Sequence, residues 1–272
     1  VIGSDGVPYY PQTPSEFAAI VKDCHANGAN ILGGCCGTTP DYIRALIAAT
    51  KDLPLPIRTK KSETIISSYT HAVTFGESPI LIGERINPTG KKKLKAALIE
   101  GDEGYVLREA VTQAEAGAQI LDVNVGVPGL DETSVLARTV QAVQSVVDLP
   151  IQIDTADPQA LEAALRCVNG KPLVNSVNGK EESLRAVLPL VARYGGAVVA
   201  LALDESGIPE TVEGRLAVVR KILARGAEYG LRPADFVVDV LCLAVSSDAQ
   251  SARVVLEAVR RVREELGCRT VL

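Results

Sequence analysis

The sequence predicts an α/β protein whose larger part is a parallel barrel of the (β/α)8, or TIM, type. After about residue 79, short apolar runs alternate with longer amphipathic stretches, and this alternation requires a parallel sheet covered by helices, either doubly wound or closed as a barrel. The length from the linker to the last residue is close to that of a barrel. Hydrophobic residues make up 47% of the 272 residues and aromatic residues 4%, a balance that suits helices packed on buried strands. Polar residues stand where several apolar runs end, as expected at the functional face of a barrel.

The start of the chain has the pattern of a βα unit with helices on both sides of a short strand. A helix is expected from Thr13 to Asn27, with a capping residue in front and Gly28 behind. A strand is expected at residues 29–32 and a further helix from Asp41 to about Thr50. We therefore expect residues 1–52 to form a domain separate from the rest of the chain. The chain has no methionine, even at position 1, so we expect it to begin inside that domain.

Residues 53–78 are predicted to link the two domains. This stretch loses apolar periodicity and contains Pro54, Pro56, Lys60 and Lys61, a composition typical of an extended surface segment.

The second domain is expected at residues 79–272, with candidate strands separated by helices. A further strand begins at residues 270–272. Because a barrel of this type has eight strands, we expect the barrel to be incomplete at its C-terminal end. The earlier candidate strands cover residues 80–83, 120–125, 151–154, 172–177, 197–203 and 236–241.

Charge and cysteine usage exclude several classes of protein. The net charge of -5 is spread along the chain and leaves no basic face for a phosphate backbone, and no apolar run approaches the length of a membrane span. We expect neither nucleic acid nor membrane as a partner. The six cysteines lack the spacing of a disulfide framework and follow no secretory leader, which predicts a reducing, cytoplasmic location.

The polar residues at the strand ends form the candidate site. Carboxylates accept hydrogen bonds from ring N–H and amine groups, asparagines both donate and accept, and none of these groups is a strong nucleophile. This chemistry favours recognition of an amide-rich heterocycle, such as a pterin ring. The alternative for any one position is that it caps the helix that follows. The candidate residues are Glu84, Asn87, Asp122, Asn124, Asp154, Asn175 and Asp239.

The same stretches resemble the pterin-binding domain of cobalamin-dependent methionine synthases. The resemblance covers nearly everything from about residue 67 to residue 272, and it is carried by GERINPTGKK (83–92), LDVNVG (121–126), IDT (153–155) and VNSVNG (174–179). It implies that Asp154, Asn175 and Asp239 hydrogen-bond the pterin and are the catalytic residues. It places Asp122 and Asn124 close by and Glu84 at the barrel mouth. Val240 follows Asp239 where a proline is expected.

The lysine run after the first strand of this domain is a secondary candidate. Lys92 and Lys93 stand where they could meet the anionic glutamate tail of a folate. The alternative is that they belong to a solvated helix face.

A second resemblance concerns the segment GGCCGTTP at residues 33–40. It is similar to the end of the homocysteine-binding, zinc-dependent barrel shared by the methionine synthase and betaine–homocysteine methyltransferase families. The resemblance implies that residues 1–52 are the C-terminal end of such a barrel. The resemblance implies that Cys35 and Cys36 are two of three zinc ligands, the third lying on an earlier strand. Zinc held by thiolates can bind a substrate thiol and lower its pKa. A cysteine pair is otherwise a small buried apolar filler.

Together the resemblances imply a methyltransferase. In that family the N5 methyl of 5-methyltetrahydrofolate passes to cob(I)alamin and then to homocysteine, which gives methionine. Cobalamin would be held by a cobalamin-binding domain of the same polypeptide outside this chain. Two alternatives stay open, a methyltetrahydrofolate:corrinoid iron–sulfur protein methyltransferase and an inactive fragment. The cysteine segment argues against the first.

Overall fold

The computed structural model describes residues 2–6, 9–54, 62–242 and 249–272. The chain divides into two compact units, Val1–Lys61 and Ser62–Leu272. Among the described residues, no helix combines the length and the apolar character that crossing a membrane requires.

In its described residues the smaller unit contains two helices, α1 (Pro14–Ala26) and α2 (Pro40–Thr50), which pack against each other. Thr13 and Glu16 form a reciprocal capping box at the start of α1, so the predicted helix start is confirmed. The strand predicted at residues 29–32 is wrong. Ile31 is 92% exposed, and this segment has no strand beside it in the described part of the unit. An apolar run needs a hydrogen-bonding neighbour to become a strand.

The larger unit is built on a parallel sheet of seven strands in sequence order, from β3 to β9. This order, with a helix following each of the first six of these strands, confirms the predicted α/β class. In the described residues β3 and β9 are the two edges, so the sheet is an open part of a barrel, as predicted. The strands are β3 (Ile82–Ile86), β4 (Ile120–Val123), β5 (Ile151–Asp154), β6 (Leu173–Asn178), β7 (Ala197–Leu201), β8 (Phe236–Asp239) and β9 (Arg269–Val271).

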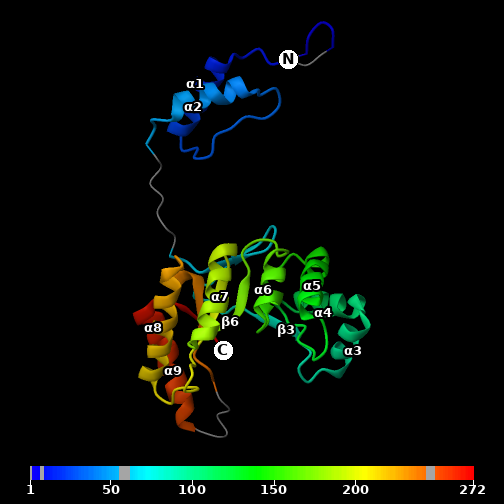
Figure 1. Ribbon diagram of the computed structural model, residues 1–272, viewed down its shortest axis with the longest axis vertical. Coiled ribbons are helices and arrows are strands. Elements are labelled where there is room, and N and C mark those ends of the chain that lie inside the picture. The colour runs from blue at the N-terminus through cyan, green and yellow to red at the C-terminus, as the bar shows by residue number, and fades with distance from the viewer. Residues whose placement is uncertain (1, 7–8, 55–61, 243–248) are drawn as a thin grey trace. The chain divides into compact units, whose positions relative to one another are not determined.

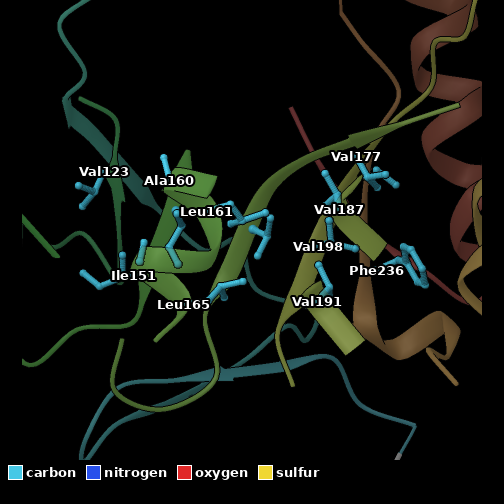
Figure 2. Packing of buried hydrophobic residues seen from close by; sticks show 14 of the residues in the cluster. Val123, Ile151, Ala160, Leu161, Leu165, Val177, Val187, Val191, Val198 and Phe236 are labelled. Carbon is cyan, nitrogen blue, oxygen red and sulfur yellow. The ribbon is translucent and has the colours of Figure 1, made fainter. Parts of the chain in front are cut away.

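The helices that connect these strands cover the outer face of the sheet (Figure 1). Strand residues such as Val123, Ile151 and Val198 are fully or almost fully buried against apolar helix residues such as Leu161 and Val191 (Figure 2). This is the main core of the unit. The helices are α3 (Lys92–Glu100), α4 (Glu103–Glu115), α5 (Glu132–Val146), α6 (Pro158–Leu165), α7 (Glu181–Tyr194), α8 (Val212–Glu228) and α9 (Ala249–Leu266), with a short 3-10 helix η1 (Pro233–Asp235) before β8.

A two-stranded antiparallel hairpin, β1 (Ile65–Ser67) and β2 (Ala72–Thr74), precedes the sheet. Its Ile66 is fully buried in a second apolar cluster with Ile120 and Leu173, the first residues of β4 and β6. The hairpin therefore covers the inner face of the sheet at the amino ends of the strands. The segment expected to be a linker thus contains a strand pair that belongs to the larger unit.

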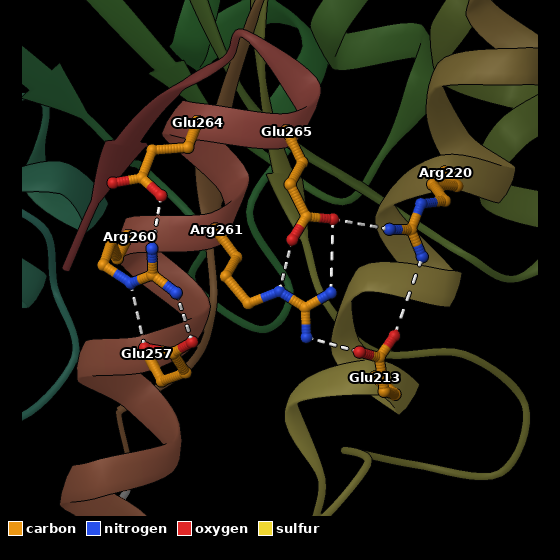
Figure 3. Close-up of polar contacts among 7 residues, drawn as sticks. All are labelled: Glu213, Arg220, Glu257, Arg260, Arg261, Glu264 and Glu265. Carbon is orange, nitrogen blue, oxygen red and sulfur yellow. Dashed lines mark hydrogen bonds and ion pairs between the residues drawn. The ribbon is translucent and has the colours of Figure 1, made fainter.

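Helices α8 and α9 are also joined by ion pairs on their exposed surfaces (Figure 3). Arg261 pairs with Glu213 and Glu265, and Arg220 pairs with the same two carboxylates. The four side chains form a closed ring of alternating charge between the two helices.

Candidate functional site

The candidate site lies on the inner face of the sheet. Side chains alternate between the two faces of a strand, so the face of each residue follows from that of its neighbours. Leu121 and Ile153 point outward into the main core, whereas Ile120 and Leu173 belong to the inner cluster. Asp122 lies two residues after Ile120 on β4, and Asn175 lies two residues after Leu173 on β6, so both point to the inner face. The inner face is thus apolar at the amino ends of β4, β6 and β8 and polar toward their carboxyl ends.

The helix-capping alternative is wrong for the residues on β4 to β6. The helices after these strands begin at other N-cap residues, which are Asp131 for α5, Asp157 for α6 and Lys180 for α7. The side chains of Asp131 and Asp157 accept hydrogen bonds from backbone N–H groups of their helices. Asp122, Asn124, Asp154 and Asn175 are therefore free of that task.

Asp154 is at the centre of the polar residues. Asn124 Nδ2 donates to Asp154 Oδ2 at 2.9 Å, and the backbone N–H of Gly126 fixes the Asn124 amide by donating to its Oδ1 at 2.8 Å. Asp154 is paired in register with Asn175 on β6. Three of the predicted residues thus come from neighbouring strand ends.

Glu84 and Asn87 form one edge of this group, on β3 and just after it. Asn87 Nδ2 donates to Glu84 Oε1 at 3.2 Å, and Asn87 Oδ1 accepts from the N–H of Thr89 at 3.0 Å. Asn87 is buried and Glu84 is exposed. The Glu84 charge acts on both Asp122 and Asp154.

Burial controls the acidity of the inner carboxyl groups. It raises the pKa of Asp122 to about 7, the negative charges of Asp154 and Glu84 add to the shift, and the hydrogen bond from Gln152 opposes it. Burial also raises the pKa of Asp154, and the hydrogen bond from Asn124 opposes that rise. Negative charge is therefore costly here, and the site favours a ligand that brings donors or positive charge.

Asp239 lies at the carboxyl end of β8, separated from Asn175 by strand β7. Its Oδ1 accepts from the N–H of Leu241 at 2.7 Å, so its side chain is held by the turn after the strand. Burial raises the pKa of Asp239, opposed by that N–H and by the charge of Arg215. Leu241 has a φ of 64°, so Val240, in place of a proline, precedes a left-handed turn residue.

The lysine run lines two cavities beside the β3–α3 loop. One, of about 320 Å³, includes Lys92 and Lys95 together with residues 126–128 after β4. The other, of about 330 Å³, includes Lys92 and Lys93 together with Tyr105 and Glu109 of α4. Lys92 thus borders both spaces, whereas Lys93 is not on the side of the Asn124 loop. Lys91 Nζ donates to the backbone oxygen of Glu84 at 2.7 Å.

Cys35 and Cys36 lie in the loop between α1 and α2 of the smaller unit, and both are exposed. Their Sγ atoms are 3.6 Å apart. Two thiolates on one tetrahedral zinc, each with a Zn–S distance of about 2.3 Å, lie about 3.8 Å apart, so the pair fits one ion. Among the described residues no group of three His, Cys, Asp or Glu side chains comes together to hold a metal.

Three side chains near the site were missed by the sequence reasoning. Gln152 on β5 contacts Asp122, Glu132 on α5 accepts from Thr155 Oγ1 beside Asp154, and Arg215 on α8 faces the Asp239 turn. Gln152 gave a usable signal, because it is a polar residue inside an apolar strand. Glu132 and Arg215 lie in helices, where a charged residue is normally solvated.

Two family models match the chain, and they divide it as the structure does. The model described as homocysteine S-methyltransferase matches residues 3–50, and the model described as pterin binding enzyme matches residues 83–272.

The chain is similar to part of the methionine synthases of two mycobacteria. It is 31% identical to that of Mycobacterium tuberculosis over 97% of this chain and 23% of the relative. It is 32% identical to that of Mycobacterium leprae over the same shares. The chain thus spans about a quarter of the length of these relatives.

Solved structures with a similar fold are dihydropteroate synthases. The enzyme from Xanthomonas albilineans in complex with 7,8-dihydropteroate has a TM-score of 0.55 and 20% identity, covering 76% of this chain and 75% of that one. The enzyme from Vibrio fischeri has a TM-score of 0.56 and 16% identity, covering 76% of each chain. At these identities the likeness shows the fold alone. The pterin binding model, however, covers well over half of the sequence, from residue 83 to residue 272, and the chain therefore belongs to the pterin binding enzyme family.

Proposed function

We propose that this chain supplies the methyltetrahydrofolate-binding part of a cobalamin-dependent methionine synthase. The larger unit would bind 5-methyltetrahydrofolate and prepare its N5 methyl for transfer. The smaller unit would contribute two thiolates to the zinc site that activates homocysteine. The order of the two matched segments, homocysteine S-methyltransferase and then pterin binding enzyme, supports this assignment.

The observation that carries the proposal is the set of Asn124, Asp154 and Asn175 on the inner face. Asn124 fixes Asp154 Oδ2 at 2.9 Å, and the register places Asn175 beside it. A carboxylate held in this way can accept hydrogen bonds from ring N–H and amine groups, and the asparagine amide can both donate and accept. These are the groups that a pterin edge presents.

The proposed catalytic task is to favour positive charge on N5. A tertiary amine is a poor leaving group until it is protonated, so the protein must stabilise the protonated form in the transition state. Asp154 and Asp239 are half-buried carboxyl groups of raised pKa, and a cation nearby would stabilise their ionised forms. Asn175 would orient the ring between them.

The two cofactors belong to other parts of the proposed cycle. Cobalamin, bound by its own domain, would supply a cobalt nucleophile for the methyl group. Zinc would lower the pKa of the homocysteine thiol. Cys35 and Cys36 fit two of its coordination positions by their 3.6 Å separation.

Two rival functions can be compared with this proposal, the first of them through the smaller unit. A methyltransferase that serves a corrinoid iron–sulfur protein needs no homocysteine-binding segment, and residues 3–50 match one. An inactive fragment predicts no binding of methyltetrahydrofolate at all. Titration of the chain with methyltetrahydrofolate separates that possibility from our proposal.

The sharpest test of the site is Asp154→Asn. The change keeps the shape but replaces an acceptor by a donor, so that ligand N–H and side-chain N–H groups face each other. An unpaired buried donor costs about 1–3 kcal/mol, and the affinity for methyltetrahydrofolate should therefore fall at least about tenfold. Isothermal titration of both proteins measures the change.

Asp157→Asn is the matched control. Asp157 is the N-cap of α6, three residues beyond Asp154, and asparagine caps a helix as well as aspartate does. It removes the same charge and should leave the affinity unchanged. Equal affinity for Asp154→Asn and the wild type would remove Asp154 from the site, and an equal loss in both variants would mean that only net charge matters.

A further inference from the structure

Asp122, one of the candidate site residues, forms a buried polar pair with Gln152. They are register partners on β4 and β5, and both are buried, with 1% and 6% of their surfaces exposed. Gln152 lies two residues before Asp154 on the same strand, so both side chains point to the inner face. The function proposed above gives this pair no task.

The hydrogen bonding of the pair is incomplete in a particular way. Gln152 Nε2 donates to Asp122 Oδ1 at 2.5 Å. The other oxygen of each group, Asp122 Oδ2 and Gln152 Oε1, is buried and has no partner. Two buried acceptors without a donor are costly. A carboxyl group and a primary amide each carry two polar atoms in a planar fork, and one proton on the carboxyl group supplies the donor that both acceptors lack.

We infer that Asp122 carries a proton in the folded protein and forms with Gln152 an uncharged acid–amide pair that positions Asp154. Gln152 donates to Oδ1 of Asp122, and the protonated oxygen of Asp122 supplies the missing donor to the amide oxygen of Gln152. The proton is taken up from water on folding. Asp122 and Gln152 are thus positioning residues, because they act on the ligand through Asp154.

The charges around the pair favour the neutral form. The charged groups that face Asp122 are Asp154 from β5 and Glu84 from β3, and both are acidic. The neighbouring β6 contributes the neutral amide of Asn175, whose interaction with Asp122 favours the charged form and, like that of Gln152, opposes the rise in pKa. A second negative charge beside Asp154 would repel its ionised form. The raised pKa of Asp122, about 7, agrees with the geometry.

The consequence for binding rests on the proposed function, whereas the proton itself does not. With Asp122 neutral, Asp154 can stay ionised and accept hydrogen bonds from the ring edge. When Asp122 loses its proton above about pH 7, repulsion between the two carboxylates should weaken binding. The proton can be measured in the free chain, so a failure of the folate proposal is distinguishable from a failure of this one.

The first experiment measures the protonation of Asp122 in the chain without a bound ligand. Carbon-13 NMR of the carboxyl carbons of the wild-type chain should show Asp122 titrating near pH 7, far above the ordinary aspartate value of 3.8. Titration of Asp122 near its ordinary value would overturn the inference. This measurement needs no variant to fold.

The second experiment compares Asp122→Asn with Asp235→Asn across pH. Between about pH 4 and pH 7 the native wild type holds one proton at Asp122 that the unfolded chain has lost, so its stability falls as pH rises. Asparagine keeps both hydrogen bonds of the pair and has no proton to lose. The unfolding constant of the wild type, relative to Asp122→Asn, should therefore rise about tenfold per pH unit in this range. A constant ratio would overturn the inference.

Asp235 is a matched control of opposite sign. It is also buried, and burial alone would raise its pKa, but the hydrogen bonds from Lys171 and from the Arg232 backbone bring that pKa below its ordinary value. The stability that it contributes is lost as pH falls through the lowered value. Between about pH 5 and pH 7 the ratio of unfolding constants for Asp235→Asn and wild type should stay constant.

The third experiment tests the positioning of Asp154. Wild-type affinity for methyltetrahydrofolate should fall as pH rises from about 7 to about 9, and that of Asp122→Asn should be constant over this range. Gln152→Leu should weaken binding about tenfold, the value of one lost hydrogen bond. Gln144→Leu, a glutamine on α5 whose amide bonds the backbone of residues 167 and 169, should not. Affinity that depends on pH equally in wild type and Asp122→Asn would overturn the positioning role.

Discussion

At the scale of single residues, Arg215 is the clearest case of a side chain that builds a site without belonging to its strand ends. It is 2% exposed, and its guanidinium donates to the backbone oxygens of Pro209, Val240 and Leu241 at 3.0, 2.7 and 3.1 Å. Two of these oxygens belong to the turn that holds Asp239. A buried cation thus fixes the backbone on which a proposed pterin-binding carboxylate stands.

Arg215→Met should therefore lower both stability and affinity for methyltetrahydrofolate. The change leaves three carbonyl oxygens without their donor, and a buried unpaired acceptor costs about 1–3 kcal/mol, so the free energy of unfolding should fall by at least about 2 kcal/mol. Urea unfolding measures the loss. Arg220→Met on the same helix removes half-exposed ion pairs and should cost at most about 1 kcal/mol. Similar losses of stability in the two variants would contradict the role of Arg215 in fixing the turn that holds Asp239.

At the scale of elements, the sequence predicted the strands of the larger unit well, because their apolar runs are bounded by polar residues. The predicted strand at residues 236–241 is observed as Phe236–Asp239, and that at 151–154 is observed as Ile151–Asp154. The strand wrongly predicted at residues 29–32 has the same local pattern but no neighbouring strand to pair with. A local sequence pattern carries no information about such a neighbour. The β1–β2 hairpin was missed for a related reason. Its two strands have three residues each, too few to show alternation.

Ile66→Ala tests whether this hairpin is part of the folded unit. Ile66 is fully buried with Ile120 and Leu173, and an isoleucine cut back to alanine in a core costs about 2–5 kcal/mol. Thermal unfolding should show a loss in that range. Tyr69→Ala, in the turn of the same hairpin and 82% exposed, should change the free energy of unfolding by less than about 0.5 kcal/mol. No loss for Ile66→Ala would mean that the hairpin detaches before the unit unfolds.

At the scale of the whole molecule, the division into two units follows the division of the chemistry. The motif with the two cysteines lies in Val1–Lys61, and the strand-end carboxylates and amides lie in Ser62–Leu272. The sequence predicted the boundary in the linker at residues 53–78, where apolar periodicity is lost. It could not predict Asp122 as a member of a pair with Gln152, because that pairing depends on the register of two neighbouring strands.

Zinc content is the prediction that belongs to this scale. Catalytic zinc sites have three protein ligands, and in the proposed site Cys35 and Cys36 would provide two. Metal analysis of the purified chain should therefore give clearly less than one zinc per chain. One tightly bound zinc that is lost on Cys35→Ser would show that another residue of this chain completes the site.

The ring of Glu213, Arg220, Arg261 and Glu265 between α8 and α9 (Figure 3) makes the attachment of the last long helix sensitive to its surroundings. Exposed ion pairs are screened by dissolved salt, whereas the cost of removing their water falls as temperature rises. The contribution of these ion pairs to the packing of α9 on α8 is therefore smallest in a cold, concentrated salt solution. The contribution of the ion pairs is largest in a hot, dilute solution, where the stabilisation from apolar contacts no longer increases with temperature.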